Sequence, residues 1–133
     1  MVDRELWEQA VAARENAYAP YSHFRVGAAL RAADGTIITG ANVENASYPL
    51  SCCAERTAVY TAAAQGLRDF VRMVVVGPGP ELISPCGGCR QVLAEFGDFE
   101  VVMADASDQV QPRVMRVAEL LPGAFSKEDL RGL

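Results

Sequence analysis

Apolar side chains near the start of the chain recur with the spacing of a helix. One row contains Leu6, Ala10, Ala13 and Ala17, and beside it lie Trp7, Val11 and Tyr18. This spacing predicts an amphipathic helix over residues 3–18. Pro20 follows closely and is expected to end the helix, because a residue that precedes proline avoids helical geometry.

Three further stretches have the pattern of β-strands. Apolar and other residues alternate over 24–30, which predicts a strand with one apolar face. Asp34-Gly35 indicates a hairpin turn, and residues 36–41 supply the returning strand. Residues 71–76 are almost continuously apolar, which favours a strand in the interior of a sheet, covered on both faces.

Helices and strands alternate over the rest of the chain. Residues 42–52 show no period and are expected to form a loop. Helices are expected at 53–65, with Gly66 after its end, and at 86–96, after a Gly/Pro loop. Strands are expected at 100–104 and 113–117, followed by a turn and a short last helix that Ser126 caps. This order predicts an α/β fold: a three-layer α/β/α arrangement around a mixed five-stranded sheet.

Composition and charge limit the classes of partner. The 133 residues suit a single domain, 1–133, and 50% of them are apolar, which allows a packed core. The formal net charge is -5 and Lys127 is the only lysine, so no nucleic-acid partner is expected. Met1–Glu5 lacks a signal-peptide pattern, and no apolar run could cross a membrane. We therefore expect a cytoplasmic protein without a membrane partner.

The cysteines are candidates for metal binding, because disulfides are rare in a reducing compartment. Cys53 and Cys86 each fall at a predicted helix start, and Cys89 lies one turn beyond Cys86. Helix N-termini favour thiolates through their partial positive charge. If the two helix starts meet, three thiolates can hold one Zn²⁺ per chain and leave a fourth position for water. The remaining cysteine, Cys52, is interpreted as a small core residue.

Glu55 is the candidate proton carrier. Residues two apart in a regular helix face different sides, so Glu55 can share a site with Cys53 only if Cys53 lies at the helix cap. We expect that geometry. A carboxylate beside metal-activated water can take a proton and pass it to a leaving group.

The motif CAE at 53–55, followed by PCGGC at 85–89, is similar to the zinc signature of the cytidine deaminases. Further similar stretches are APYS (19–22), FRVGAAL (24–30), NVEN (42–45), CAER (53–56) and LPGAF (121–125). Together they resemble the short, homotetrameric, three-cysteine form of that family over almost the whole chain. The resemblance implies a cytidine deaminase-like fold and the hydrolytic deamination of cytidine and deoxycytidine in pyrimidine salvage, with release of ammonia.

The resemblance also implies the roles of the reacting groups. Zinc is implied on Cys53, Cys86 and Cys89. Hydroxide is implied to attack C4 of the cytosine ring, and Glu55 to protonate N3 and then the departing amine.

The same resemblance implies the substrate contacts. Asn42 and Glu44 are implied to hold the ribose hydroxyls, Phe24 to pack against the base, and the backbone of Ala54 to contact the pyrimidine edge. The residues implied to approach a neighbouring subunit's site in a homotetramer are Ala46, Tyr48 and Phe125. Without the resemblance, core packing is the default for Phe24, and Asn42 and Glu44 are ordinary polar loop residues.

Two arginines are candidates to offset the charge of the thiolates. Zinc with three thiolates carries a net charge of -1, which makes bound water a poorer acid. Arg56 follows Cys53 by three residues, so we hypothesise that it donates to the sulfurs as groups around a metal site often do. Arg90 is the weaker candidate for the same role. The only histidine, His23, has no feature that indicates a ligand.

Three alternatives stay open. The first is another deaminase, acting on blasticidin, a guanine or a base in RNA. The second is a thiol redox protein that uses Cys86 and Cys89, since a CxxC pair needs no zinc for that activity. The third is a zinc-containing binding module without catalysis.

Overall fold

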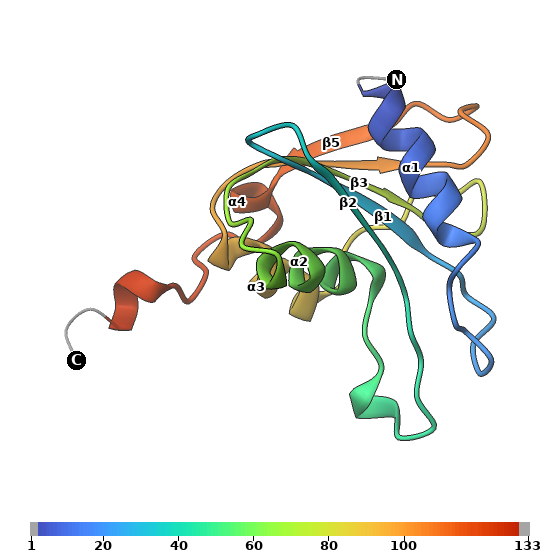
Figure 1. Ribbon diagram of the computed structural model, residues 1–133, viewed down its shortest axis with the longest axis horizontal. Helices are drawn as coiled ribbons and strands as arrows, with labels where there is room; N and C mark the ends of the chain where they lie inside the picture. Colours follow the sequence, from blue (N-terminus) through green and yellow to red (C-terminus); the bar gives the residue numbers. More distant parts are fainter. Residues whose placement is uncertain (1–2, 131–133) are drawn as a thin grey trace.

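The computed structural model describes residues 3–130, so the ends of the predicted domain 1–133 lie outside the described residues. Its sheet has the order β2-β1-β3-β4-β5 and consists of β1 (Gly27–Ala32), β2 (Ile37–Ala41), β3 (Phe70–Val76), β4 (Glu100–Ala104) and β5 (Arg113–Arg116). Strands β3 and β4 are parallel, and the other neighbours are antiparallel. Helix α1 (Arg4–Arg14) covers one face, and α2 (Ala54–Ala64) and α3 (Gly87–Glu95) lie on the other (Figure 1). The predicted three-layer α/β/α architecture is confirmed.

Helix α1 ends earlier than its apolar pattern predicts. Its last helical residue is Arg14, whereas the predicted helix continues to residue 18. The Tyr18 N–H donates to the Asn42 carbonyl, and the Tyr18 carbonyl accepts from the Glu44 N–H. These hydrogen bonds hold residue 18 in a bridge with the segment after β2, and a helical residue could not make them. The prediction of a helix through residue 18 is therefore wrong.

The hairpin of β1 and β2 forms as predicted, but β1 differs in two respects. It begins at Gly27 rather than Phe24, and it is buried on both faces. Ala28 packs in the core beneath α2, and Ala29 packs beneath α1. The prediction of a single apolar face is therefore wrong. The second face is buried because its small residues allow α1 to pack closely on the strand. A Cβ on Gly27, for example, would lie 2.1 Å from the Ala10 carbonyl oxygen. The interior position predicted for β3 is confirmed, since it lies between β1 and β4.

The remaining helices agree with the predictions except at the C-terminal side of β5. Gly66 follows α2 with a positive φ of 88°, which is a common way to end a helix. The loop at 42–52 contains one short 3₁₀ turn, η1 (Tyr48–Leu50), and the last helix is η2 (Lys127–Leu130). Helix α4 (Val117–Leu120) was not predicted; the Arg116 N–H donates to the Glu119 carboxylate and caps it. Within residues 3–130, no helix is long and apolar enough to cross a bilayer.

The strand register explains why α2 and α3 start close together. Gly27 pairs with Ala41 at the end of β2 and with Val76 at the end of β3. Both strands therefore end at the same end of the sheet, the edge formed by the strand termini. Each exit loop then leads into a helix on the same face, and α2 and α3 contact each other. The two helix N-termini thus meet above this edge.

Candidate active site

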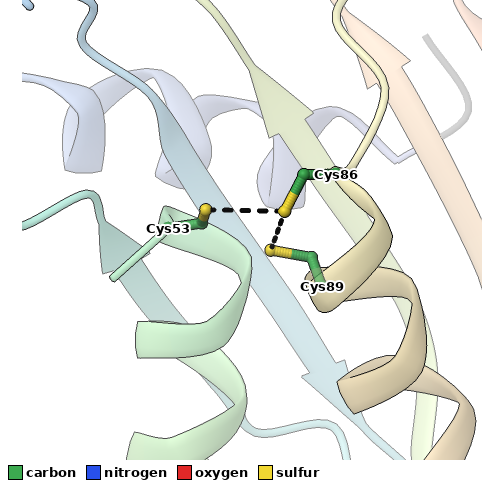
Figure 2. Close-up of side chains that lie close together, drawn as sticks. All are labelled: Cys53, Cys86 and Cys89. Carbon is green, nitrogen blue, oxygen red and sulfur yellow. Dashed lines mark hydrogen bonds between the residues drawn. The ribbon is translucent and has the colours of Figure 1, made fainter. Parts of the chain in front are cut away.

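Three cysteine sulfurs gather where α2 and α3 begin (Figure 2). The Sγ atoms of Cys53 and Cys86 lie 3.8 Å apart, and those of Cys86 and Cys89 lie 3.5 Å apart. All three sulfurs lie within 4.8 Å of one another, and no other histidine, cysteine or carboxylate among residues 3–130 joins this group. Cys52, the fourth cysteine, is half-buried rather than part of the core, which corrects its predicted role.

These sulfurs have the spacing of a zinc site. A zinc–sulfur bond of about 2.3 Å puts neighbouring sulfurs of a tetrahedron about 3.8 Å apart. The observed separations of 3.8 and 3.5 Å match that edge and are too long for a disulfide. Three soft thiolate ligands suit Zn²⁺, and a three-residue set leaves the fourth position open. The donor set therefore fits zinc.

The predicted cap position of Cys53 is confirmed, and Cys86 occupies the same position before α3. Cys53 is the N-cap of α2, with φ -71° and ψ 157°, and Cys86 is the N-cap of α3, with φ -67° and ψ 168°. Both backbones are extended, so their side chains do not follow the helical periodicity. Cys53 and Glu55 consequently line the same pocket, although they are two residues apart.

Arg56 lies against the thiolates, as hypothesised. Its Nη2 donates to Cys53 Sγ at 3.3 Å, and its Nε is buried without a hydrogen-bond partner. Hydrogen bonding from the Cys89 thiol lowers the pKa of Cys53 to about 5, and Arg56 and Cys86 act in the same direction against the effect of burial. The same sharing of a proton with Cys53 raises the pKa of Cys89. Cys53 therefore ionises before Cys89.

Arg90 has a different role from the one hypothesised for it. Its guanidinium donates to the carbonyls of Pro85 and Leu120 and to the hydroxyl of Ser84. No hydrogen bond joins it to a sulfur among the described residues. Because its donors bind Ser84, Pro85 and Leu120, Arg90 ties the loop before Cys86 to the end of α4.

Glu55 is a buried carboxylate at the floor of the site. The residue is only 4% exposed, in the first turn of α2. Burial raises the pKa of Glu55 to about 7; the charge of Cys53 acts in the same direction, while its own backbone N–H and Arg56 oppose the shift. A carboxylic acid in this range can both hold and release a proton near neutral pH.

A pocket of about 570 Å³ opens over Cys53, Cys86 and Glu55. Its lining comprises Ser22, Phe24, Val26, Asn42, Glu44, Cys53, Ala54, Glu55, Ile83, Ser84 and Cys86. The predicted residues Phe24, Asn42, Glu44 and Ala54 are all among them. Phe24 is 46% exposed and faces this pocket, so the default expectation of a core residue is wrong.

Sequence reasoning did not identify every lining residue. Ser22, Val26, Ile83 and Ser84 were missed as site residues, although Ser22 lies in the APYS stretch quoted above. The carboxamide of Asn42 also makes two hydrogen bonds within the protein that were not expected. It donates to the Phe24 carbonyl at 2.7 Å and accepts from the Val26 N–H at 2.9 Å. Asn42 thus holds the segment that carries Phe24.

Three predicted residues lie outside this pocket. Ala46, Tyr48 and Phe125 are exposed and are absent from the lining within one chain. Tyr48 is 69% exposed and packs edge-on against Tyr21, and Phe125 is 61% exposed. The segment with Ala46 and Tyr48 projects away from the sheet, and the segment that follows α4 extends away from the body (Figure 1). These positions leave all three side chains free to meet another chain.

The fold and the site agree with comparisons to known proteins. Residues 1–105 match the family described as the cytidine and deoxycytidylate deaminase zinc-binding region. This chain belongs to that family. Cys53, Cys86, Cys89 and Glu55 all fall within the matched residues, and the family's zinc-binding character agrees with the three-sulfur site.

Individual relatives cover nearly the whole chain. A cytidine deaminase of Halalkalibacterium halodurans is 49% identical over 97% of this chain and 98% of its own length. Another, of Sporosarcina psychrophila, is 52% identical over 89% of this chain and 87% of its own length. The crystal structure of cytidine deaminase from Burkholderia pseudomallei superposes with a TM-score of 0.87 at 51% identity, covering 94% of this chain and 100% of that one. The predicted cytidine deaminase-like fold is thereby confirmed.

Proposed function

We propose that this chain is a zinc-dependent enzyme that hydrolyses the exocyclic amine of cytidine and deoxycytidine, giving uridine, deoxyuridine and ammonia. The observation that carries the proposal is the placement of buried Glu55 beside a three-thiolate metal site in one open pocket. A structural zinc site would be closed by a fourth protein ligand, and a redox CxxC pair would not need Glu55. The high identity to cytidine deaminases supports the substrate.

The chain's own residues divide the work between metal binding and proton transfer. Cys53, Cys86 and Cys89 would hold the zinc ion, which, when bound, supplies Lewis-acid activation of the attacking water. Glu55, which lines the same pocket, would accept the proton of that water. It can then deliver protons to N3 of the ring and to the departing amine. Its burial keeps bulk water away from this transfer.

The lining of the pocket favours a nucleoside over a nucleotide. It contains two carboxylates, Glu44 and Glu55, and neither lysine nor arginine among the described residues. A phosphate group would therefore meet negative charge without a cation to bind it. Glu44 and Asn42 would bind the sugar hydroxyls, Phe24 would contact the base, and the backbone of Ala54 would contact the pyrimidine edge. Their shared position in the lining of one pocket supports these roles.

We further propose that the active form is a cytoplasmic homotetramer in which each chain is one catalytic domain. The exposed Ala46, Tyr48 and Phe125 would complete the pocket of a neighbouring subunit. Their exposure in one chain and their absence from its pocket support this assignment.

One coupled experiment tests the activity and the metal together. Purified protein is incubated with cytidine while uridine and ammonia are followed, and zinc is measured on the same sample. We expect about one zinc per chain and turnover that Glu55→Gln lowers by at least about 100-fold while zinc is retained. Zinc-free protein with a reversible Cys86–Cys89 disulfide would contradict the proposal in favour of the redox alternative. Unchanged turnover of Glu55→Gln would contradict the role of Glu55.

A further inference from the structure

The Ala19–Phe24 turn wraps around the carboxylate of Glu44. The backbone N–H groups of Tyr21 and Ser22 both donate to Glu44 Oε1, at 3.0 and 3.1 Å. His23 adopts a left-handed conformation with φ 58°, and its N–H donates to the Ala19 carbonyl. This unusual turn is what directs two successive N–H groups at one carboxylate oxygen.

The hydroxyl of Ser22 makes the third contact with this carboxylate. Ser22 Oγ donates to Glu44 Oε2 and accepts from the Phe24 N–H at 3.0 Å. The hydrogen bond from the Ser22 hydroxyl is also the main reason why the pKa of Glu44 lies below its ordinary value. One hydroxyl therefore joins the carboxylate that faces the sugar to the backbone of the aromatic residue that faces the base.

Among the described residues, the Ser22 hydroxyl is the only side-chain group that accepts a hydrogen bond from the Phe24 N–H. Its carbonyl accepts from Asn42 Nδ2 at 2.7 Å, so both of its backbone polar groups are held by side chains of the pocket. Phe24 lies before β1 and lacks the ladder of hydrogen bonds that fixes a strand. Loss of the Ser22 hydroxyl would free Phe24 on one side and Glu44 Oε2 on the other.

We propose that Ser22 is a positioning residue for substrate binding, which sets the Glu44 carboxylate and the Phe24 ring in one arrangement before the nucleoside enters. This inference rests on the proposed nucleoside deaminase function. Pre-positioned groups bind with a smaller loss of conformational freedom, so the effect of Ser22 is on affinity for the nucleoside. The chemical step, which Glu55 serves, does not depend on it.

The test compares Ser22→Ala with Ser22→Thr, which keeps the hydroxyl, on cytidine and on 2′,3′-dideoxycytidine, which lacks the sugar hydroxyls near Glu44. We expect Ser22→Ala to raise KM for cytidine about tenfold, since a hydrogen bond to a charged group is lost. We expect kcat to stay within about twofold and the preference for cytidine over the dideoxy analogue to fall. Ser22→Thr is expected to restore KM and preference.

Two controls separate positioning from folding. Ser107→Ala removes a comparable hydroxyl–carboxylate hydrogen bond, to Asp105 Oδ2, outside the pocket and should leave KM unchanged. Ser22 acts on the preference for cytidine through Glu44. In a chain that already carries Glu44→Gln, Ser22→Ala should therefore change this preference little. The proposal would be overturned if Ser22→Ala lowered kcat/KM equally for both nucleosides. It would also be overturned if the effects of Ser22→Ala and Glu44→Gln on the preference for cytidine were fully additive. A wild-type chain that deaminates no nucleoside would instead overturn the proposed function, before any variant is compared.

Discussion

At the scale of single residues, the contact between Arg56 and Cys53 predicts that Arg56 strengthens zinc binding. The guanidinium donates to a sulfur at 3.3 Å and has a second buried nitrogen without a partner. Its charge would compensate the net negative charge of a zinc–trithiolate group. We expect Arg56→Gln to weaken zinc binding about tenfold or more, as is typical for residues that support metal ligands. Competition with a chromophoric chelator measures the effect.

Arg113→Gln provides the matched control for this experiment. Arg113 is exposed on β5, outside the pocket, so the same change of charge should leave zinc affinity unaltered. Equal zinc affinities for wild type and Arg56→Gln would show that the arginine does not compensate the thiolates.

The residues of the metal site could be predicted because their signal is local. Cys53 and Glu55 are two apart, and a cap position is the simple way for both to reach one ion. The contacts of Ser22 and Asn42 could not be predicted in this way. They join loops that are distant in the sequence, and a serine or asparagine in a loop has many possible partners. Without the resemblance, Phe24 was assigned to the core of a strand over 24–30. That assignment was wrong because the alternation of apolar residues does not reveal where a strand begins.

At the scale of elements, the close packing of β2 on α2 positions the first turn of α2, which contains Glu55. A Cβ on Gly40 would lie 2.4 Å from Thr57 Oγ1 and 2.5 Å from both the Ala54 carbonyl oxygen and the Ala58 nitrogen. Two of these neighbours are helix backbone and cannot move alone. We expect Gly40→Ala to lower the free energy of unfolding by about 1–3 kcal/mol, as overpacking typically does. Urea denaturation gives this value, and a fall in turnover should accompany it because α2 carries Glu55.

Gly88→Ala is the contrasting substitution for stability. A Cβ on Gly88, in the first turn of α3, meets nothing within 4 Å. Alanine is the better helix former, so the free energy of unfolding should not fall. A Gly40→Ala variant as stable as wild type would mean that α2 can shift without cost.

Most elements could be predicted, and the errors lie at their ends. The continuous apolar run of β3 and the caps of α2 and α3 are strong local signals. The end of α1 has no such local signal. The hydrogen bonds of Tyr18 with Asn42 and Glu44 compete with the hydrogen bonds of a longer helix, and they form only in the folded chain. Helix α4 has only four residues, too few for a helical period to emerge from the sequence.

At the scale of the whole molecule, the single chain does not contain its complete predicted site. The sheet, its three layers and the meeting of two helix starts follow from the order of the elements. Ala46, Tyr48 and Phe125 were assigned by resemblance, and one chain leaves them exposed outside its own pocket. A surface that completes the site of another copy produces no distinctive pattern in one sequence, since exposed aromatic residues also occur singly on ordinary surfaces.

Complementation between two inactive variants tests whether Phe125 works in a neighbour's pocket. Glu55→Gln removes the proposed proton carrier within its own chain, and Phe125→Ala removes the side chain that is proposed to enter the pocket of another chain. Each variant alone should have little activity. After subunit exchange in an equal mixture, about a quarter of the sites would combine an intact Glu55 with an intact Phe125 from the neighbouring subunit. Turnover should therefore rise well above the sum of the two separate samples.

The expected gain depends on the two residues acting from different chains. If Phe125 served the pocket of its own chain, every chain in the mixture would still carry one defect, and mixing would restore nothing. Mass spectrometry of the intact assemblies distinguishes mixed tetramers from the two pure ones, because the variants differ in mass. A lack of gain in mixed tetramers would therefore reject the shared site. If Phe125→Ala alone kept full turnover, the aromatic residue would have no part in the site.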